Sequence, residues 1–176
     1  MEKLDALRTS LPDAARDIRL NLENVLKPAT LETAQVYGVA VACAYAARTP
    51  KLTEALIAAA KSHDVPDGVI EDAKAAAILM AMNNVYYRFR HISGKEAYSQ
   101  KPARLRMQRI NQVTSNKADF ELFCLAVSAI NNCETCVRSH EATVLGHGMT
   151  EDHVHDAVRI AATVHAAAVG LETLDV

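Results

Sequence analysis

The 176-residue sequence predicts an all-α fold. Apolar residues, many of them alanine, recur three or four positions apart in successive windows, which is the spacing of one face of an α-helix. Only 6 glycines and 5 prolines interrupt the chain, fewer than the many turns of a β-rich fold require. The breaks between the apolar windows divide the chain into a series of helices.

Four helices are expected in the first half of the chain. The first opens at Leu11-Pro12-Asp13, because proline is tolerated in a first helical turn, and it ends before Pro28. Its apolar residues Ala14, Ala15, Ile18, Leu22 and Val25 form one face. The four helices are expected at about residues 12–27, 30–47, 49–63 and 67–88, the last of them after the break Val65-Pro66-Asp67-Gly68.

Three helices are expected in the second half, after a polar and irregular stretch. Ser93-Gly94 ends the preceding region, and residues 93–116 show the least apolar periodicity of the chain. Gly146-His147-Gly148 marks a turn between the last two helices. These helices are expected at about residues 116–130, 133–146 and 150–170.

An internal repeat relates the two halves. A shift of 84 residues places His63 on His147, and it places the helix start Pro66-Asp67 on Thr150-Glu151. Such a repeat predicts a duplicated helical unit that packs on itself. We therefore expect a single domain over residues 1–176, with repeat halves at about 30–90 and 114–174. The first copy has Thr49 and Leu52 where the second has Cys133 and Cys136.

Composition excludes several classes of function. With 19 basic and 21 acidic side chains the net charge is −2, and without a basic run no nucleic-acid partner is expected. Apolar stretches end well before the roughly 18 residues of a membrane span, so no membrane association is expected. The N-terminus lacks the apolar core of a signal peptide, which favours the cytoplasm. In that reducing compartment the 4 cysteines are not expected to form a structural disulfide framework.

The closely spaced pair Cys133-Glu-Thr-Cys136 is the main candidate for chemistry. Two cysteines three residues apart at a helix start can form a disulfide with little backbone movement. The free N–H groups of a first helical turn stabilise a thiolate. His140 lies four residues after Cys136, on the same helix face, where it can relay a proton to or from the sulfur. These features favour a dithiol that cycles between oxidised and reduced states.

Other interpretations of the same residues remain open at this stage. The cysteine pair can be half of a zinc site, completed by two of His140, His147, His153 and His155, although no second Cys-x-x-Cys occurs. The pair can also be purely structural. Spacing alone favours a solvated surface position for Glu121. Cys43 and Cys124 lie within apolar runs and are expected in the core.

Several segments resemble the AhpD family of alkyl hydroperoxide reductases, within the carboxymuconolactone decarboxylase-like superfamily. The resemblance spans essentially the whole chain. Its most specific part is the dithiol segment Cys133-Glu-Thr-Cys136-Val-Arg-Ser-His140-Glu141, preceded by Glu121-Leu-Phe and Ala126-Val-Ser-Ala-Ile-Asn131. The other parts are Met82-Asn83-Asn84-Val85-Tyr86-Tyr87-Arg88 and Leu11-Pro12-Asp13-Ala14-Ala15-Arg16-Asp17-Ile18.

The resemblance implies an all-helical domain with a duplicated unit that assembles into a homotrimer. It implies weak activity on organic hydroperoxides and, as the main role, reduction of an oxidised peroxiredoxin partner, AhpC. Electrons would come from NADH through dihydrolipoamide dehydrogenase and a lipoyl-bearing acyltransferase, so dihydrolipoamide would be the donor group. It implies no bound metal, haem or flavin.

The resemblance also implies a role for each residue of the motif. Cys136 would be the attacking thiol, which forms a sulfenic acid with peroxide or a mixed disulfide with the peroxiredoxin. Cys133 would be the resolving, proton-donating thiol, and His140 and Glu121 would form a proton relay. Thr135 stands where some members of the family have histidine, so weaker direct peroxidase activity is expected.

The leading hypothesis is therefore a lipoyl-linked thiol oxidoreductase that reduces peroxides and a peroxiredoxin. The alternatives are a stand-alone peroxidase or disulfide reductase of the same superfamily with another electron donor, and a zinc-stabilised helical interaction protein. A ring-opening lactone decarboxylase is disfavoured, because the dithiol has no evident part in that reaction.

Overall fold

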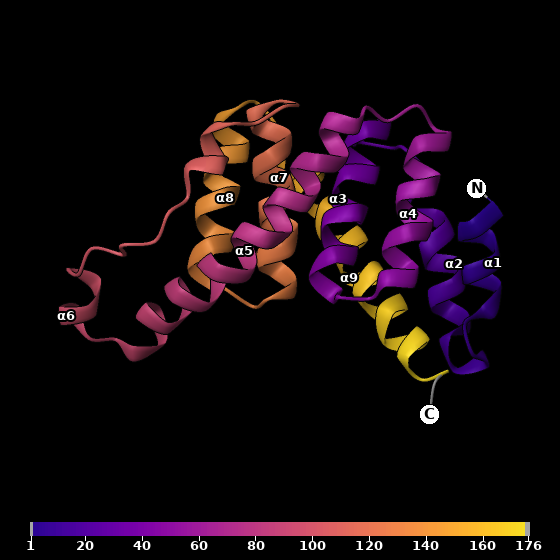
Figure 1. Ribbon diagram of the computed structural model, residues 1–176, viewed down its shortest axis with the longest axis horizontal. Helices are drawn as coiled ribbons and strands as arrows, with labels where there is room; N and C mark the ends of the chain where they lie inside the picture. The colour runs from indigo at the N-terminus through magenta and orange to yellow at the C-terminus, as the bar shows by residue number, and fades with distance from the viewer. Residues whose placement is uncertain (1, 175–176) are drawn as a thin grey trace.

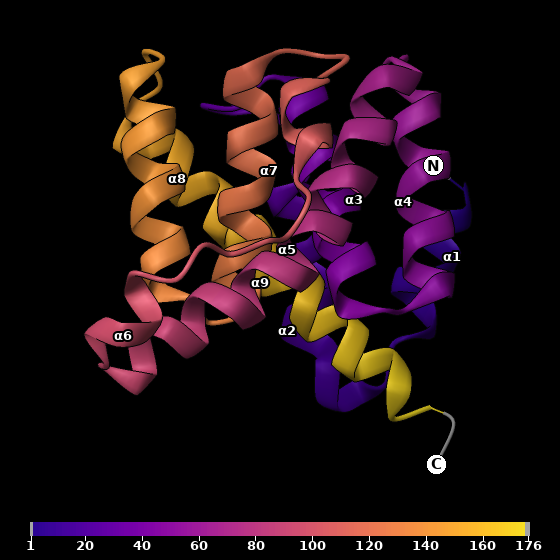
Figure 2. The ribbon, with the colours of Figure 1, turned by 60° about the vertical axis from the view of Figure 1, so that its left-hand side comes forward.

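The computed structural model describes residues 2–174 and confirms the all-α fold. No β-strand occurs within this range. The helices form one body, from which the end of α5 (Asp67–Ser93) and the following short helix α6 (Glu96–Ser99) project to one side (Figures 1 and 2). None of the described helices combines the length and hydropathy that crossing a bilayer requires.

Seven further helices complete the described fold, and all but the first of them fall close to the expected positions. They are α1 (Glu2–Ser10), α2 (Arg16–Val25), α3 (Thr33–Ala47), α4 (Pro50–Ser62), α7 (Lys117–Ile130), α8 (Glu134–Gly146) and α9 (Glu151–Glu172). Two 3-10 turns, η1 (Asp13–Ala15) and η2 (Gln108–Asn111), accompany them. The helix expected from Pro12 thus begins as η1 and continues as α2.

Three parts of the chain differ from the sequence prediction. Helix α1 was not expected from the sequence, because Leu4 is its only buried residue and tertiary contact with α4 orders it. Helix α5 continues past Arg88 to Ser93 and ends at Gly94, whose φ of +61° is the left-handed conformation of a helix C-terminus. The irregular stretch after it contains α6 and η2, neither of which buries a residue.

The duplication is visible in the backbone. Helices α3, α4 and α5 begin at residues 33, 50 and 67, and α7, α8 and α9 begin at 117, 134 and 151, so each pair is offset by 84. The left-handed residues follow the same offset. Arg48 and Asn132 have φ of +58° and +54°, and Asp64 and Gly148 have φ of +56° and +89°. Both copies therefore use the same turns between their helices.

The two copies hold each other through equivalent aspartates. Asp72 of α5 is fully buried, and it accepts hydrogen bonds from the backbone N–H groups of Thr114 (2.8 Å) and Ser115 (2.7 Å), which lead into α7. Asp156 of α9 accepts hydrogen bonds from Thr30, which leads into α3. Each third helix therefore fixes the segment before the first helix of the other copy, so neither copy is complete by itself.

Helices α3 and α7 form the centre of the core. Gly38 of α3 lies against the ring of Phe123 on α7, where a Cβ atom would overlap the ring. Cys43 and Cys124 are fully buried on these helices, as expected, and burial raises the pKa of both thiols. Because α7 runs directly into the dithiol segment, the core fixes the place from which α8 begins.

Candidate active site

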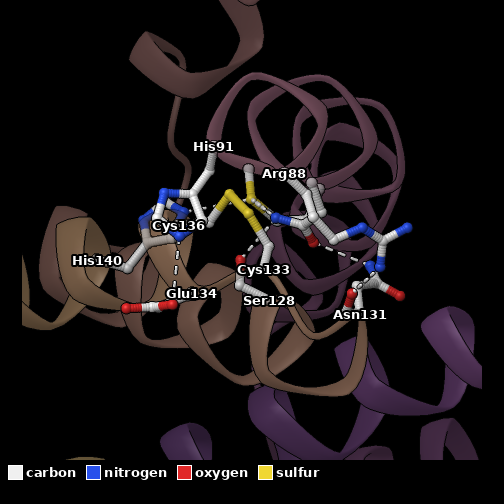
Figure 3. Close-up of a disulfide and its surroundings, with 10 residues drawn as sticks. Arg88, His91, Ser128, Asn131, Cys133, Glu134, Cys136 and His140 are labelled. Atoms are coloured by element: carbon white, nitrogen blue, oxygen red, sulfur yellow. Dashed lines mark hydrogen bonds and ion pairs between the residues drawn. A yellow bond between two sulfur atoms is a disulfide. The ribbon is translucent and has the colours of Figure 1, made fainter. Parts of the chain in front are cut away.

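Cys133 and Cys136 form a disulfide at the start of α8 (Figure 3). Their Cα atoms lie 5.3 Å apart, within the usual range for a disulfide. Helix α7 ends at Ile130, and the left-handed residue Asn132 turns the chain so that Cys133 becomes the N-cap residue of α8. Cys133 is fully buried, whereas Cys136 is 7% exposed, so Cys136 is the one in contact with solvent.

The helix start gives the cysteines a favourable electrostatic environment for a thiolate. The Cys133 N–H group donates to the Ser128 carbonyl at 3.1 Å, and its carbonyl accepts from the Val137 N–H group at 2.9 Å. Its side chain makes no capping hydrogen bond to the first turn of α8. The cysteines thus lie at the N-terminal end of α8, where the unpaired N–H groups of a first turn and the positive end of a helix dipole favour an anionic group.

A carboxylate–imidazole pair lies on α7 and α8. The Nδ1 atom of His140 lies 2.6 Å from Oε2 of Glu121, and the other carboxylate oxygen lies 2.6 Å from Nζ of Lys117. Lys117 is one helical turn before Glu121 on α7. The arrangement brings together Glu121 and His140 as the resemblance implied, one turn of α8 beyond Cys136.

The burial of Glu121 corrects one expectation from spacing alone. The residue is only 5% exposed, not a solvated surface carboxylate, because α8 covers this side of α7. Burial by itself raises the pKa of Glu121, but the hydrogen bonds from His140 and Lys117 outweigh burial and lower the pKa to about 2. Glu121 is therefore ionised near neutral pH and accepts the hydrogen bond from His140.

The second ring nitrogen of His140 faces a sulfur atom of α5. Its Nε2 atom lies 3.3 Å from Sδ of Met80, which is buried. Nδ1 carries a hydrogen, because it lies against the Glu121 carboxylate. A thioether accepts hydrogen bonds and donates none, so the Met80 contact is most favourable when Nε2 is also protonated.

A hydrogen-bond network from α5 fixes the turn before the dithiol. The buried side chain of Asn84 donates to Oγ of Ser128 at 2.9 Å and accepts from Nδ2 of Asn131, also at 2.9 Å. Arg88, one turn further along α5, donates to the Asn131 carbonyl at 2.5 Å. The network thus connects α5 to Ser128 and Asn131, the two ends of the turn that precedes Cys133.

Comparison with known proteins places the chain in a family. The model of the carboxymuconolactone decarboxylase family matches residues 97–175. A protein of Anaeromyxobacter dehalogenans (strain 2CP-C) named alkyl hydroperoxide reductase AhpD is 63% identical over 98% of this chain and 92% of its own length. A protein of the same name from Rhodospirillum centenum (strain ATCC 51521 / SW) is 47% identical over 96% of this chain and 90% of its own length.

The chain belongs to the AhpD family. Its described fold is thus that of an AhpD protein. The family's name is that of an oxidoreductase, which is in keeping with the disulfide between Cys133 and Cys136. In Figure 3, His140 and His91 lie on the Cys136 side of the disulfide, whereas Arg88 and Asn131 lie on the other side.

The contribution of α5 to the site of this AhpD chain was not predicted from the sequence. Met80, Asn84 and Arg88 recur every four residues, so they lie on one helix face, and all of them contact the dithiol region or its relay. His91, on the same part of α5, lies 3.4 Å from the carboxylate of Glu134 in α8. The four-residue spacing was a visible signal, but it did not reveal which helix this face would contact.

The remaining histidines do not join the dithiol in a metal centre of the described chain. Across residues 2–174, no group of three or more His, Cys, Asp or Glu side chains is arranged to hold a metal ion. Nδ1 of His147 donates to the carbonyl of Thr143, and His153 contacts Thr150 at the start of α9. These two histidines, considered above as zinc ligands, cap helix ends.

Proposed function

We propose that this protein is a thiol oxidoreductase that reduces organic hydroperoxides and regenerates a peroxiredoxin partner, AhpC. The carrying observation is the Cys133–Cys136 pair at the start of α8, with the His140–Glu121 pair one turn beyond it. The names of the relatives as alkyl hydroperoxide reductases support the same activity. The proposal needs no bound cofactor, because the dithiol itself carries the two electrons.

The peroxide half-reaction assigns different roles to the cysteines. The Cys136 thiolate attacks one peroxide oxygen, the O–O bond breaks, and Cys136 becomes a sulfenic acid while an alkoxide leaves. A proton from the imidazolium of His140 converts the alkoxide to the alcohol. The Cys133 thiol then attacks the sulfenic sulfur, water leaves, and the Cys133–Cys136 disulfide forms. The 7% exposure of Cys136, against none for Cys133, supports this assignment.

The peroxiredoxin half-reaction uses the same two sulfur atoms. The Cys136 thiolate attacks the disulfide of oxidised AhpC and forms a mixed disulfide, while one AhpC thiolate leaves. Cys133 then attacks the Cys136 sulfur and releases the second AhpC thiolate. Each exchange needs a proton taken from the attacking thiol and returned to a leaving thiolate. His140, oriented by the ionised Glu121, is placed to carry this proton.

Electrons return through dihydrolipoamide in this proposal. One dihydrolipoamide thiolate attacks the Cys133–Cys136 disulfide, the second thiolate closes the lipoamide disulfide, and both cysteines are released as thiols. A lipoyl-bearing acyltransferase would present the group, and dihydrolipoamide dehydrogenase would reduce it again with NADH. The cytoplasm, which holds NADH, is the proposed compartment.

A homotrimer is the proposed assembly. Its support is a pair of exposed apolar residues near the end of α5, which projects from the body of the molecule together with α6 (Figure 2). Both residues are more than half exposed, and neighbouring exposed apolar side chains are typical of a surface that contacts another chain. They are Phe89 and Ile92. Native mass spectrometry of the purified protein would give three times the chain mass, and a monomer would contradict this part.

A coupled assay tests the function. NADH consumption would be followed with dihydrolipoamide dehydrogenase, lipoamide and cumene hydroperoxide, with and without AhpC. We expect turnover that AhpC increases and that Cys136→Ser abolishes. Turnover without any increase by AhpC would indicate a stand-alone peroxidase. Stoichiometric bound zinc with thiols inert to peroxide would instead support the interaction protein, and substantial activity of Cys136→Ser would refute the role of that residue.

A further inference from the structure

We propose that a cavity beside the dithiol turn binds the carboxylate group of a small amphipathic organic acid. The cavity has a volume of about 520 Å³ and lies between α5 and the C-terminal ends of α3 and α7. This volume is within the range of small-molecule sites in proteins. The residues that matter for the argument are Arg48, Arg88, Ile78, Val85, Asn131 and Asn132.

The charge of the cavity selects an anion. Arg48 and Arg88 are its charged lining residues, and no aspartate or glutamate lines it. Within residues 2–174, neither guanidinium lies within 4.0 Å of a carboxylate. The local charge is thus positive on a chain whose net charge is −2. A guanidinium presents parallel N–H donors that match the two oxygens of a carboxylate, so either arginine is suited to bind the carboxylate of an organic acid.

The walls of the cavity select an amphipathic ligand. Ile78 and Val85 of α5 line its mouth with more than half of their surface exposed, and alanines and Ile130 line the rest of this side. Filling the mouth with a short alkyl or aryl group would remove this apolar surface from water. The polar residues Asn131 and Asn132 also line the cavity. An acid with a short apolar body matches both kinds of lining, whereas inorganic anions match only one.

The cavity is connected to the dithiol through its own lining residues. Asn131 and Asn132 immediately precede Cys133, and Arg88 both lines the cavity and donates to the Asn131 carbonyl (Figure 3). A bound carboxylate would share Arg88 with that carbonyl. The ligand would therefore lie beside the turn that positions the cysteines, which gives the site a direct link to the redox centre.

The carboxylate has two possible sources, a free acid or an acidic side chain of a second copy of this chain. We commit to the free acid, because the cavity volume of about 520 Å³ is large enough for a whole small molecule. Isothermal titration calorimetry with hexanoate on the oxidised protein tests it, with 1-hexanol as the neutral probe. The matched variants are Arg48→Gln and Arg19→Gln, which lower the net charge equally. Arg19 lies on α2 outside the cavity, where it pairs with Asp13.

We expect hexanoate to bind the wild type and Arg19→Gln alike, and Arg48→Gln to bind at least about tenfold more weakly, because a charge-assisted hydrogen bond is lost. Arg48→Lys, which keeps the charge, should retain part of the affinity. Equal affinities of Arg48→Gln and Arg19→Gln, or equal binding of hexanol, would overturn the proposal. Failure of hexanoate to bind, together with a lower native mass of Arg48→Gln, would assign the arginine to a contact between copies instead.

The titration measures binding and not turnover. Its outcome is therefore independent of the proposed function, which the coupled NADH assay tests. If the protein did not reduce hydroperoxides, the proposed carboxylate site would be unaffected. If hexanoate did not bind, the proposed dithiol chemistry would be unaffected.

Discussion

Nδ1 of His140 lies 2.6 Å from Oε2 of Glu121, across the contact between α8 and α7. Glu121 is buried and ionised, and its second oxygen is bound by Lys117. The carboxylate thus fixes both the orientation of the imidazole and the position of the proton on Nδ1. The Nε2 atom of the same ring lies 3.3 Å from Sδ of Met80, and His140 follows Cys136 by one turn of α8.

Replacing Glu121 by glutamine should lower the rate of thiol–disulfide exchange by about 10²- to 10⁴-fold, because an oriented general acid–base typically contributes that much. The measurement is stopped-flow reduction of the disulfide by dihydrolipoamide. Glu141→Gln is the matched control, since Glu141 neighbours His140 on α8 but does not bond to its ring. Equal rates for the two variants would show that Glu121 has no part in the relay.

Acid should destabilise the wild type more than Glu121→Gln. The pKa of Glu121 is lowered from 4.5 to about 2 in the folded protein, so its ionised form stabilises the fold fully above pH 4.5. As the pH falls from 4.5 towards 2, this contribution, at most about 3 kcal/mol, is lost. Urea unfolding at several pH values measures the free energy, and parallel pH profiles of the two proteins would contradict the prediction.

The neighbouring residues Asn83 and Asn84 should respond differently to alanine. Asn84 bonds to Ser128 and Asn131, whereas Oδ1 of the equally buried Asn83 has no hydrogen-bond partner in the described part of the chain. We expect Asn84→Ala to lower the free energy of unfolding by about 1–3 kcal/mol more than Asn83→Ala.

The redox readout separates positioning from stability in this pair. Asn84→Ala should also shift the midpoint potential of the Cys133–Cys136 pair in a glutathione titration, because the turn before Cys133 loses its support. Asn83→Ala should leave the potential unchanged. If the wild type and both variants had the same midpoint potential, Asn84 would have a purely structural role.

Gly38→Ala should destabilise the protein by about 1–3 kcal/mol, because its Cβ atom would overlap the Phe123 ring and force α3 and α7 apart. Gly146, at the end of α8, offers the control. A Cβ atom there meets nothing within 4 Å, so Gly146→Ala should be neutral or stabilise by up to about 1 kcal/mol. Thermal unfolding measures both, and a stabilised Gly38→Ala variant would refute the close approach.

The local sequence pattern was sufficient to predict the positions of most of the helices. The breaks around Pro50, Pro66 and Gly148 fall at or next to observed helix ends, because they act on the backbone where they stand. Helix α1 was not predicted, since contact with α4 stabilises it and its own sequence has only a weak apolar face. Glu121 was placed at the surface by spacing and is buried in the fold.

The sequence by itself determined the all-α fold, the 84-residue offset of the repeat and the position of the dithiol at a helix start. These are consequences of periodicity, turn residues and short spacings, which involve neighbours along the chain. Only the tertiary structure decided that Glu121 is buried against His140 and that Asn84 and Arg88 of α5 hold the turn before Cys133. Those contacts join residues 19 to 47 positions apart, and helix packing, not local backbone preference, determines which faces meet.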